Sequence, residues 1–509
     1  MPLAHTLAVS LAGLEGQLVE VQCDISSGLP GLSFTGLPDT SVVEARDRVR
    51  SALVNSGVAW PNRKITVALL PADVRKVGSR FDLALAVAVL AGAGVVPAEA
   101  VADAVWLAEL GLDGRLRPVR GVLPSVLAAR RLGIERVVVA AANAREAALV
   151  SGLQVRAAEN LAELVAWLTG QGPAPEPVLA PAAAASDPTG PDLADVVGQT
   201  AAKRALEIAA AGGHHLSMVG TPGAGKTMLA KRLPGLLPPL DDPAAMEVTA
   251  VHSVAGLIGE RPQLVRRPPL QAPHHTTSVA ALVGGGSYLA RPGAISLAHH
   301  GVLFLDEAAE FAPSALDALR QPLEDGFVVL HRGGGTVRYP ARFQLVLAAN
   351  PCPCGQPPTR CTCAAPARRR YDQRLSGPLL DRIDLRVRVE AVPHADLLRA
   401  AGERETSAAV AERVAVARAA AAERWAGRWR VNAEVPGSTL RSAPWLLPRR
   451  ALRPTRTWLE RGRLSARGFD RVLRLSWTVA DLSGRPVPDA SDVDEALFYR
   501  TGAANTWAA

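Results

Sequence analysis

The feature that most constrains this chain is a glycine-rich segment near its middle. It matches the phosphate-binding pattern G-x-x-x-x-G-K-[ST] at every position with Gly220, Thr221, Pro222, Gly223, Ala224, Gly225, Lys226 and Thr227. A strand-like run (216–219) precedes it and a helix-like run (228–233) follows. Backbone N–H groups of such a loop surround phosphate oxygens, and the helix N-terminus adds partial positive charge. The pattern predicts a nucleotide-binding loop, and the alternative is a plain turn before a helix.

An apolar run that ends in two carboxylates follows eighty residues beyond Lys226. Residues 301–307 read Gly-Val-Leu-Phe-Leu-Asp-Glu, as a buried strand does. Such a strand places Asp306 beside a Mg²⁺ ion that Thr227 also binds, while Lys226 reaches the β- and γ-phosphates of ATP. Glu307 is then positioned to polarise a water for attack on the γ-phosphate. The alternative is a core strand whose acidic end caps the next helix.

A second apolar run ends in an amide. Residues 343–350 read Phe-Gln-Leu-Val-Leu-Ala-Ala-Asn, which predicts a buried strand. Its last residue, Asn350, is then placed to hydrogen-bond the γ-phosphate or the attacking water.

Composition limits the class of protein. With 509 residues, 48% of them apolar, the chain is expected to form two to four folded domains. The net charge of +8 permits a polyanionic partner such as DNA, although arginines also serve ion pairs. We expect no signal peptide and no membrane contact, because Glu15 interrupts the N-terminal apolar stretch and the run 83–96 is too short to span a bilayer. Few, clustered cysteines favour a cytoplasmic location.

The order of the runs predicts an α/β protein with several parts. Residues 1–170 alternate expected strands (64–70 and 136–140) with expected helices (82–90 and 123–132). Residues 171–191, rich in Pro and Ala, are expected to be a linker. The nucleotide-binding core is then expected at 192–393 and a helical domain at 394–509, with helices at 201–211, 313–324, 395–424 and 470–482.

Four cysteines form two C-x-C pairs, Cys352 with Cys354 and Cys361 with Cys363. Four thiolates so close together can hold a tetrahedral Zn²⁺, and the segment has little apolar content to order it otherwise. The alternative is four free thiols in a reducing compartment.

Several basic or imidazole side chains are candidates for contacts. Residues 327–339 predict a hairpin whose Arg332 and Arg338 contact a DNA backbone in a central pore, or a plain surface hairpin. Arg382 is a candidate arginine finger for a neighbouring subunit's nucleotide, the alternative being an ion pair with Asp381 or Asp384. Arg467, just before the expected helix 470–482, is a candidate γ-phosphate contact or a solvated side chain. A loop role is expected for His274 and His275.

These motifs, in this order, resemble those of the AAA+ ATPases, and more closely those of the magnesium-chelatase-like branch called YifB or ComM. The resemblance covers nearly the whole chain. Its specific stretches are 34–39 (Phe-Thr-Gly-Leu-Pro-Asp), 272–276 (Ala-Pro-His-His-Thr), 284–287 (Gly-Gly-Gly-Ser), 301–307, 350–355 (Asn-Pro-Cys-Pro-Cys-Gly), 376–384 (Ser-Gly-Pro-Leu-Leu-Asp-Arg-Ile-Asp) and 464–467 (Leu-Ser-Ala-Arg).

The resemblance implies a Lon-protease-like N-terminal domain, a P-loop AAA+ core and a C-terminal helical lid, assembled as a homo-hexameric ring. It assigns Asn350 as sensor 1, Arg382 as the finger acting in trans and Arg467 as sensor 2. For the ComM members it implies a DNA helicase that drives branch migration, on single-stranded or branched DNA, during natural transformation and recombination.

The N-terminal part departs from the protease pattern. Lon-type proteolysis needs a Ser-Lys dyad, but the two matching stretches read Gly-Ser-Arg-Phe-Asp (78–82) and Gly-Val-Leu-Pro-Ser (121–125). Ser79 is displaced by one position and the second stretch offers no lysine to activate it. We therefore expect a non-proteolytic domain. The alternative to a DNA motor is a chelatase-type ATPase that remodels a protein partner for Mg²⁺ insertion into a porphyrin.

Overall fold

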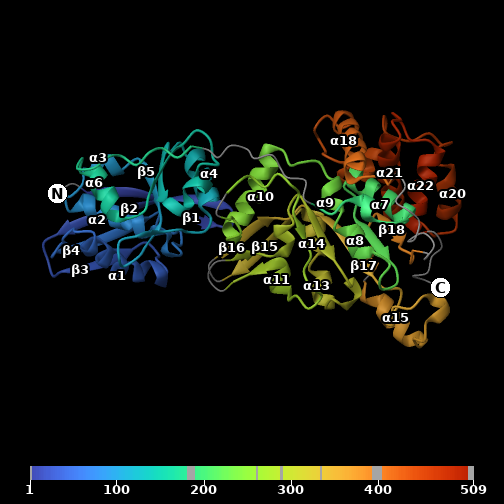
Figure 1. Cartoon of the computed structure of the whole chain (residues 1–509), viewed down its shortest axis with the longest axis horizontal. Helices are drawn as coiled ribbons and strands as arrows, with labels where there is room; N and C mark the ends of the chain where they lie inside the picture. Colours follow the sequence, from blue (N-terminus) through green and yellow to red (C-terminus); the bar gives the residue numbers. More distant parts are fainter. Residues whose placement is uncertain are drawn as a thin grey trace.

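The computed structural model describes residues 3–179, 190–259, 262–286, 290–332, 335–375, 377–392 and 404–502. The molecule is elongated, with an N-terminal α/β part at one end, a second α/β part in the middle and C-terminal helices at the other end (Figure 1). The expected α/β class is confirmed. Among the described residues, no helix is both long and apolar enough to cross a membrane.

The N-terminal part is built on a seven-stranded mixed sheet in the order β3-β4-β2-β1-β5-β8-β9. β1 pairs antiparallel with β2, and β2 antiparallel with β4, whereas the remaining pairs are parallel. Buried residues alternate along β4, as expected for a strand with one face on a core. The strands are β1 (Ala4–Ala12), β2 (Glu15–Ser26), β3 (Gly31–Thr35), β4 (Lys64–Leu70), β5 (Ala104–Leu107), β8 (Arg136–Ala140) and β9 (Gln154–Ala158).

The helices of this part include one that is apolar on every side. Every residue of α2 (Asp82–Gly92) is buried, which confirms that the apolar run is a core helix. Asp82 at its start is buried too and accepts a hydrogen bond of 2.7 Å from Arg48 Nε. Further helices of this part are α1 (Thr40–Asn55), α4 (Val122–Arg131), α5 (Ala144–Ala147) and α6 (Leu161–Leu168).

The middle part is built on a five-stranded sheet in the order β11-β14-β17-β10-β18, in which every pair is parallel. Its strands are β10 (Leu216–Val219), β11 (Leu270–Gln271), β14 (Val302–Leu305), β17 (Gln344–Ala349) and β18 (Leu385–Arg388). The expected strands are confirmed. Because all five strands run the same way, the loops that follow them meet at one edge of the sheet.

Two expected helices of the middle part are each divided. The run after the phosphate loop forms α8 (Lys226–Ala230) and α9 (Leu233–Leu236), and the expected helix 313–324 forms α13 (Pro313–Asp317) and α14 (Arg320–Asp325). Pro234 and Pro322 have no N–H to donate to the carbonyls four residues earlier, so one continuous helix cannot form. This part also contains helices α7 (Thr200–Gly212) and α10 (Asp242–Ala255) and the hairpin of β15 (Phe327–Arg332) and β16 (Gly335–Pro340).

The C-terminal helices share a hydrophobic core with the middle sheet. Val472 and Trp477 belong to the same buried cluster as Leu216 and Val346. Asp384 also joins the two regions, because it accepts from Arg471. The helices are α18 (Ser407–Arg424), α19 (Gly437–Leu440), α20 (Arg453–Glu460), α21 (Ala466–Leu482) and α22 (Ala490–Thr501).

Helix α21 begins four residues before the expected position. The Ser465 hydroxyl caps it by accepting a 3.1 Å hydrogen bond from the Gly468 N–H. Arg467 therefore lies in the first turn of the helix, and the expectation that it precedes the helix is wrong.

Part of the expected linker 171–191 lies against the edge of the N-terminal sheet. The Val178 N–H donates to the Val155 carbonyl, so the chain returns along β9. Residues 180–189 lie outside the described part. The N-terminal and middle parts also contact each other directly. The Gly121 N–H donates to the Ser253 carbonyl, and the Ser253 hydroxyl donates to Glu146.

Candidate nucleotide site

The glycine-rich loop lies between β10 and α8, at the edge where the parallel strands end. Gly223 and Gly225 have φ angles of 79° and 96°, in the region that side chains with a Cβ rarely adopt. Gly220 is constrained by space instead, because a Cβ there would meet the Val389 carbonyl oxygen at 2.2 Å. Three glycines of the motif are thus required by backbone geometry.

Lys226 is nearly buried inside this loop. Its ammonium group donates to the carbonyls of Gly220 at 2.7 Å and Thr221 at 3.0 Å, and to Asn350 Oδ1 at 3.1 Å. Burial lowers the pKa of Lys226, while the carboxylates of Asp306 and Glu307 act in the opposite direction. The loop therefore holds a cation at its centre, and the structure brings Asn350 to it from the neighbouring strand.

The two carboxylates after β14 face the loop. The Thr227 hydroxyl donates to Asp306 Oδ2 at 2.6 Å, so the two residues expected to bind Mg²⁺ are in direct contact. Asp306 Oδ1 accepts from the Glu307 N–H at 3.0 Å. Glu307 has a φ of 50°, uncommon for a residue with a side chain, and its carboxylate is about half exposed.

His275 contacts Glu307, which the sequence analysis missed. The His275 Nδ1 lies 3.1 Å from Glu307 Oε2. The loop 272–277 follows β11, and β11 pairs with β14, so both loops leave the same edge of the sheet. A prediction of strand order, rather than of loop character alone, would have placed this histidine beside the carboxylate.

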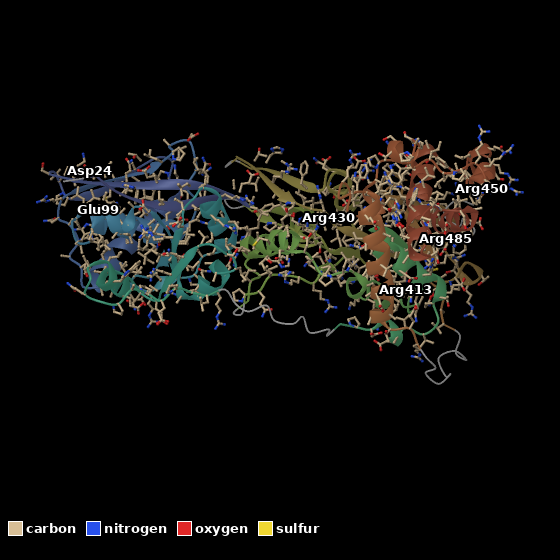
Figure 2. All side chains as sticks on the ribbon, turned by 90° about the horizontal axis from the view of Figure 1, so that it is seen from above. Asp24, Glu99, Arg413, Arg430, Arg450 and Arg485 are labelled. Carbon is tan, nitrogen blue, oxygen red and sulfur yellow. The ribbon has the colours of Figure 1, made fainter. Side chains whose placement is uncertain are left out.

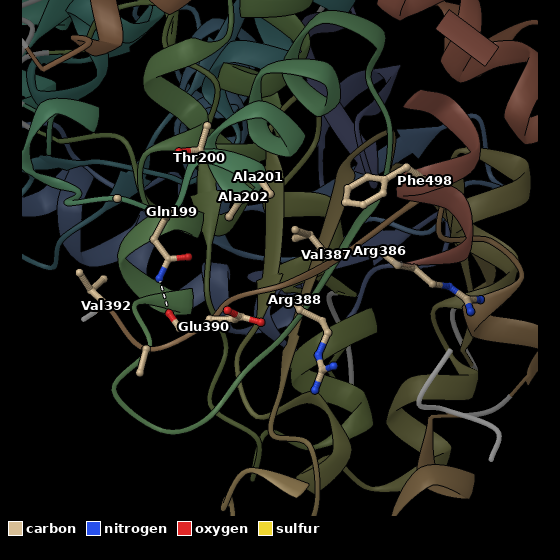
Figure 3. A pocket seen from close by; sticks show the side chains of 12 residues that line it. Gln199, Thr200, Ala201, Ala202, Arg386, Val387, Arg388, Glu390, Val392 and Phe498 are labelled. Carbon is tan, nitrogen blue, oxygen red and sulfur yellow. Dashed lines mark hydrogen bonds between the residues drawn. The ribbon is translucent and has the colours of Figure 1, made fainter. Parts of the chain in front are cut away.

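The structure has one hollow at the loop and a second one near it. One, of about 380 Å³, is lined by the residues named above from the loop, β14 and β17. The other, of about 550 Å³, is lined by the start of α7, the end of β18 and Phe498 (Figure 3). Gln199 connects them, because its amide donates both to the Ala224 carbonyl of the loop at 3.1 Å and to the Glu390 carbonyl at 2.5 Å. The sequence analysis did not identify this second hollow.

The structure does not bring the two candidate arginines to the loop of their own chain. Arg382 lies after α16 (Gly377–Leu380), donates to the Pro378 carbonyl at 2.6 Å and pairs with Glu324, not with Asp381 or Asp384. Arg467 is exposed at the start of α21. Neither arginine lines either hollow.

The four cysteines converge in the loop that follows Asn350. The Sγ atom of Cys352 lies 3.2 Å from that of Cys354 and 3.5 Å from that of Cys361. All four thiols, Cys363 included, lie within 4.8 Å of one another and can hold a metal ion. Tetrahedral zinc–sulfur bonds of about 2.3 Å require sulfurs about 3.8 Å apart. Hydrogen bonding, first from the Gln356 backbone, lowers the pKa of Cys354 to about 6, which favours a thiolate.

A second cluster, Glu247 with His299 and His300, has a different character. The Nε2 atoms of both histidines lie 3.1 Å from Glu247 Oε2. His299 Nδ1 accepts from the Arg342 N–H, so the proton of the neutral ring is on Nε2 and is donated to Glu247. This tautomer leaves no lone pair on the His299 ring for a metal, and the cluster ties α10 to the segments before β14 and β17.

The two arginines of the hairpin lie at different distances from its turn. Register places Arg332 opposite Gly335 at the turn, whereas Arg338 pairs with Val329, away from the tip. The Arg338 guanidinium lies 3.6 Å from the centre of the Phe327 ring. The Arg332 side chain lies outside the described residues, as does Ser287 of the glycine-rich run 284–287.

The two stretches expected to match a protease dyad meet, but without a dyad. Ser79 donates to Glu109, and Arg80, fully buried, donates to Ser125 Oγ at 3.3 Å and to the Arg120 carbonyl at 3.0 Å. Burial lowers the pKa of Arg80 to about 10, so it remains a cation at neutral pH. A guanidinium that stays protonated cannot serve as the base that activates a serine.

Comparisons with known proteins agree with this arrangement. Family models match residues 21–143 (Subunit ChlI of Mg-chelatase), 192–397 (Magnesium chelatase, subunit ChlI) and 404–500 (Magnesium chelatase, subunit ChlI C-terminal). An uncharacterized protein of Mycobacterium tuberculosis is 53% identical over 99% of this chain and all of its own length. Competence protein ComM of Haemophilus influenzae is 42% identical over 98% of both chains.

The protein YifB of Escherichia coli is 40% identical, over 98% of this chain and 97% of its own. Matches of this identity over nearly the full length of each relative leave no large region of the chain unaccounted for. The chain therefore belongs to the YifB and ComM family of magnesium-chelatase-like AAA+ proteins.

Proposed function

We propose that the protein is an ATP-hydrolysing motor that acts on DNA in the cytoplasm, as a homo-hexameric branch-migration helicase in recombination or natural transformation. The observation that carries the ATPase part is the convergence of Lys226, Thr227, Asp306, Glu307 and Asn350 on one hollow at the end of a parallel sheet. The relative named ComM, a competence protein, supports the DNA part.

The residues at the loop fit ATP with Mg²⁺. Lys226 and the loop N–H groups would hold the β- and γ-phosphates, and Thr227 with Asp306 would bind Mg²⁺, which neutralises phosphate charge. Glu307 would take the proton of the attacking water, and Asn350 would orient that water or the γ-phosphate. The second hollow, joined to the loop by Gln199, would take the adenine base.

The absence of Arg382 and Arg467 from the lining of this hollow supports a ring assembly. Arg382 pairs with Glu324, and neither Arg382 nor Arg467 lines either hollow. Neither arginine therefore reaches the γ-phosphate position within its own chain. Arg382 and Arg467 from neighbouring chains would supply the positive charge that stabilises phosphoryl transfer. The hairpin with Arg332 and Arg338 would contact the DNA backbone.

The four-cysteine loop would bind Zn²⁺. Its sulfurs already lie near tetrahedral spacing, and the segment between the first and the last cysteine contains only one described turn of 3-10 helix, Pro358–Arg360. Zinc would supply the order that this segment's few apolar residues do not. The prediction is checked by metal analysis of protein purified with thiol protection, where one zinc per chain is expected.

The chelatase alternative rests on similarity to magnesium-chelatase subunits, in the family models and in distant relatives. Their names refer to a subunit of magnesium chelatase, and a partner-remodelling ATPase would use the same site. No contact in the described residues favours a porphyrin partner over DNA. The buried Arg80 between Ser125 and Arg120 counts against proteolysis by the N-terminal domain, for which we propose a structural or DNA-handling role.

Strand displacement tests the proposal. Wild type and Glu307→Gln are supplied with forked DNA or a four-way junction and ATP, and particle mass is measured with and without nucleotide. We expect ATP-dependent displacement by wild type and none by the variant, although the variant still binds ATP. Wild type that hydrolyses ATP but neither binds nor displaces DNA at low salt would exclude the motor and favour the chelatase alternative.

A further inference from the structure

The C-terminal helical region carries most of the chain's excess positive charge. Residues 404–502 contain 18 arginines, no lysine and 11 Asp or Glu, an excess of 7 from a net charge of +8. Many of these arginines have acidic partners that explain them. Arg424 pairs with Asp481, Arg471 with Asp384, and Arg485 with Asp492. Ion pairs, together with hydrogen bonds to backbone carbonyls such as those made by Arg418 and Arg500, thus account for the arginines that pack between elements.

A group on the outside of this region has no such partners. Between α19 and the first turn of α21, residues 441–467 contain eight arginines and one carboxylate, Glu460, which pairs with Arg456. Apart from Arg467, five of the exposed arginines make no side-chain hydrogen bond or ion pair with any part of the chain that the structure describes. We call them the arginine surface: Arg449, Arg450, Arg453, Arg461 and Arg463.

The arginine surface lies away from the expected DNA contact of the hairpin. Helix α20, around which its residues are arranged, lies at one end of the long axis, whereas β15 and β16 lie beside the N-terminal part (Figure 1). Figure 2 shows Arg450 at the end of the molecule opposite Asp24 and Glu99. The two sets of arginines are therefore two separate places on one chain.

Like charges concentrated on a short segment repel one another, and without acidic neighbours this repulsion opposes folding. A polyanion relieves it, and guanidinium groups suit phosphate because they donate two parallel hydrogen bonds. We propose that the arginine surface binds the phosphate backbone of nucleic acid, as a second contact besides the hairpin. This inference rests on the proposed action on DNA. It adds a second place on the chain, outside the expected pore, where DNA is bound.

Binding through phosphates predicts a salt dependence rather than a sequence preference. Each contact to duplex DNA contributes about 0.9 to the slope of log affinity against log salt concentration. The test variant is Arg449→Gln/Arg450→Gln/Arg453→Gln. The matched control is Arg50→Gln/Arg63→Gln/Arg131→Gln, which removes three exposed arginines of the N-terminal part that make no side-chain hydrogen bond or ion pair with the described residues. Fluorescence anisotropy of labelled duplexes of two unrelated sequences is measured from about 50 to 200 mM salt.

We expect the test variant to lower the salt slope by about 2 to 3, equally for both sequences, and the control to leave it unchanged. ATP turnover without DNA and particle mass should equal those of wild type for both variants. An unchanged slope in the test variant, with wild type binding DNA, overturns this inference and leaves the motor proposal standing. A change in particle mass also overturns it, because the surface then joins chains. Failure of wild type itself to bind DNA overturns the proposed function instead.

Discussion

The two α/β parts of this chain differ in how far their charged side chains are buried and hydrogen-bonded. In the N-terminal part, Arg80 is buried, and its guanidinium donates hydrogen bonds to Ser125 Oγ and to the Arg120 carbonyl. In the middle part, Glu307 remains half exposed on a strained backbone, beside a hollow. Groups that are fully hydrogen-bonded hold a fold together, whereas chemistry needs groups that are positioned but still open to a ligand. The comparison favours the middle part as the place of the proposed ATP hydrolysis.

The largest expected effect comes from a residue that does not line its own chain's site. Arg382→Ala should reduce ATP turnover by about 10³-fold or more, because it removes charge stabilisation of phosphoryl transfer. ATP binding, measured by a fluorescent analogue, should persist. Mixing this variant with Lys226→Ala should restore part of the turnover, since some interfaces then combine an intact loop with an intact arginine. A mixture no more active than its components would place Arg382 outside the neighbour's site.

Glu307→Gln should reduce turnover by about 10²- to 10⁴-fold, because it removes the base while keeping the shape of the side chain. Nucleotide affinity should remain close to that of wild type. Lys226→Ala, in contrast, should lose affinity or turnover, because the cation that contacts the phosphates is gone. Equal turnover of Glu307→Gln and wild type would assign the base elsewhere.

His275 offers a finer test of the open site. His275→Ala removes the 3.1 Å contact to Glu307 Oε2 and should change the turnover number by about tenfold, with little change in ATP affinity. The matched control is His274→Ala, the adjacent histidine, whose Nδ1 bonds Thr276 instead. If both variants have the same turnover number, then His275 does not position Glu307.

The smallest effect is expected in the closed N-terminal part. Ser79→Ala should leave ATP turnover, DNA binding and the absence of casein cleavage unchanged, because Ser79 only donates to Glu109 and has no lysine beside it. The free energy of unfolding of this variant, measured by thermal denaturation, should fall by no more than the loss of one hydrogen bond costs, on the order of 1 kcal/mol. Casein cleavage by wild type that Ser79→Ala abolishes would reverse the comparison between the two parts.

Sequence patterns predicted the middle part well, since its motif residues are close in sequence to strand ends. The loop 220–227, the strand before it and Asp306 are all where the patterns place them, because one local rule fixes each. The contacts that were missed join residues far apart: His275 with Glu307, and Gln199 with Glu390. They depend on strand order and on side-chain packing, which no local pattern encodes. The divided helices were missed because single prolines outweighed apolar spacing.

The most direct test of the account is ATP turnover per chain, measured with and without a four-way DNA junction at low salt. We predict a rate that rises several-fold with DNA, from particles several times the mass of one chain. A single chain that hydrolyses ATP at the same rate with and without DNA would contradict the account.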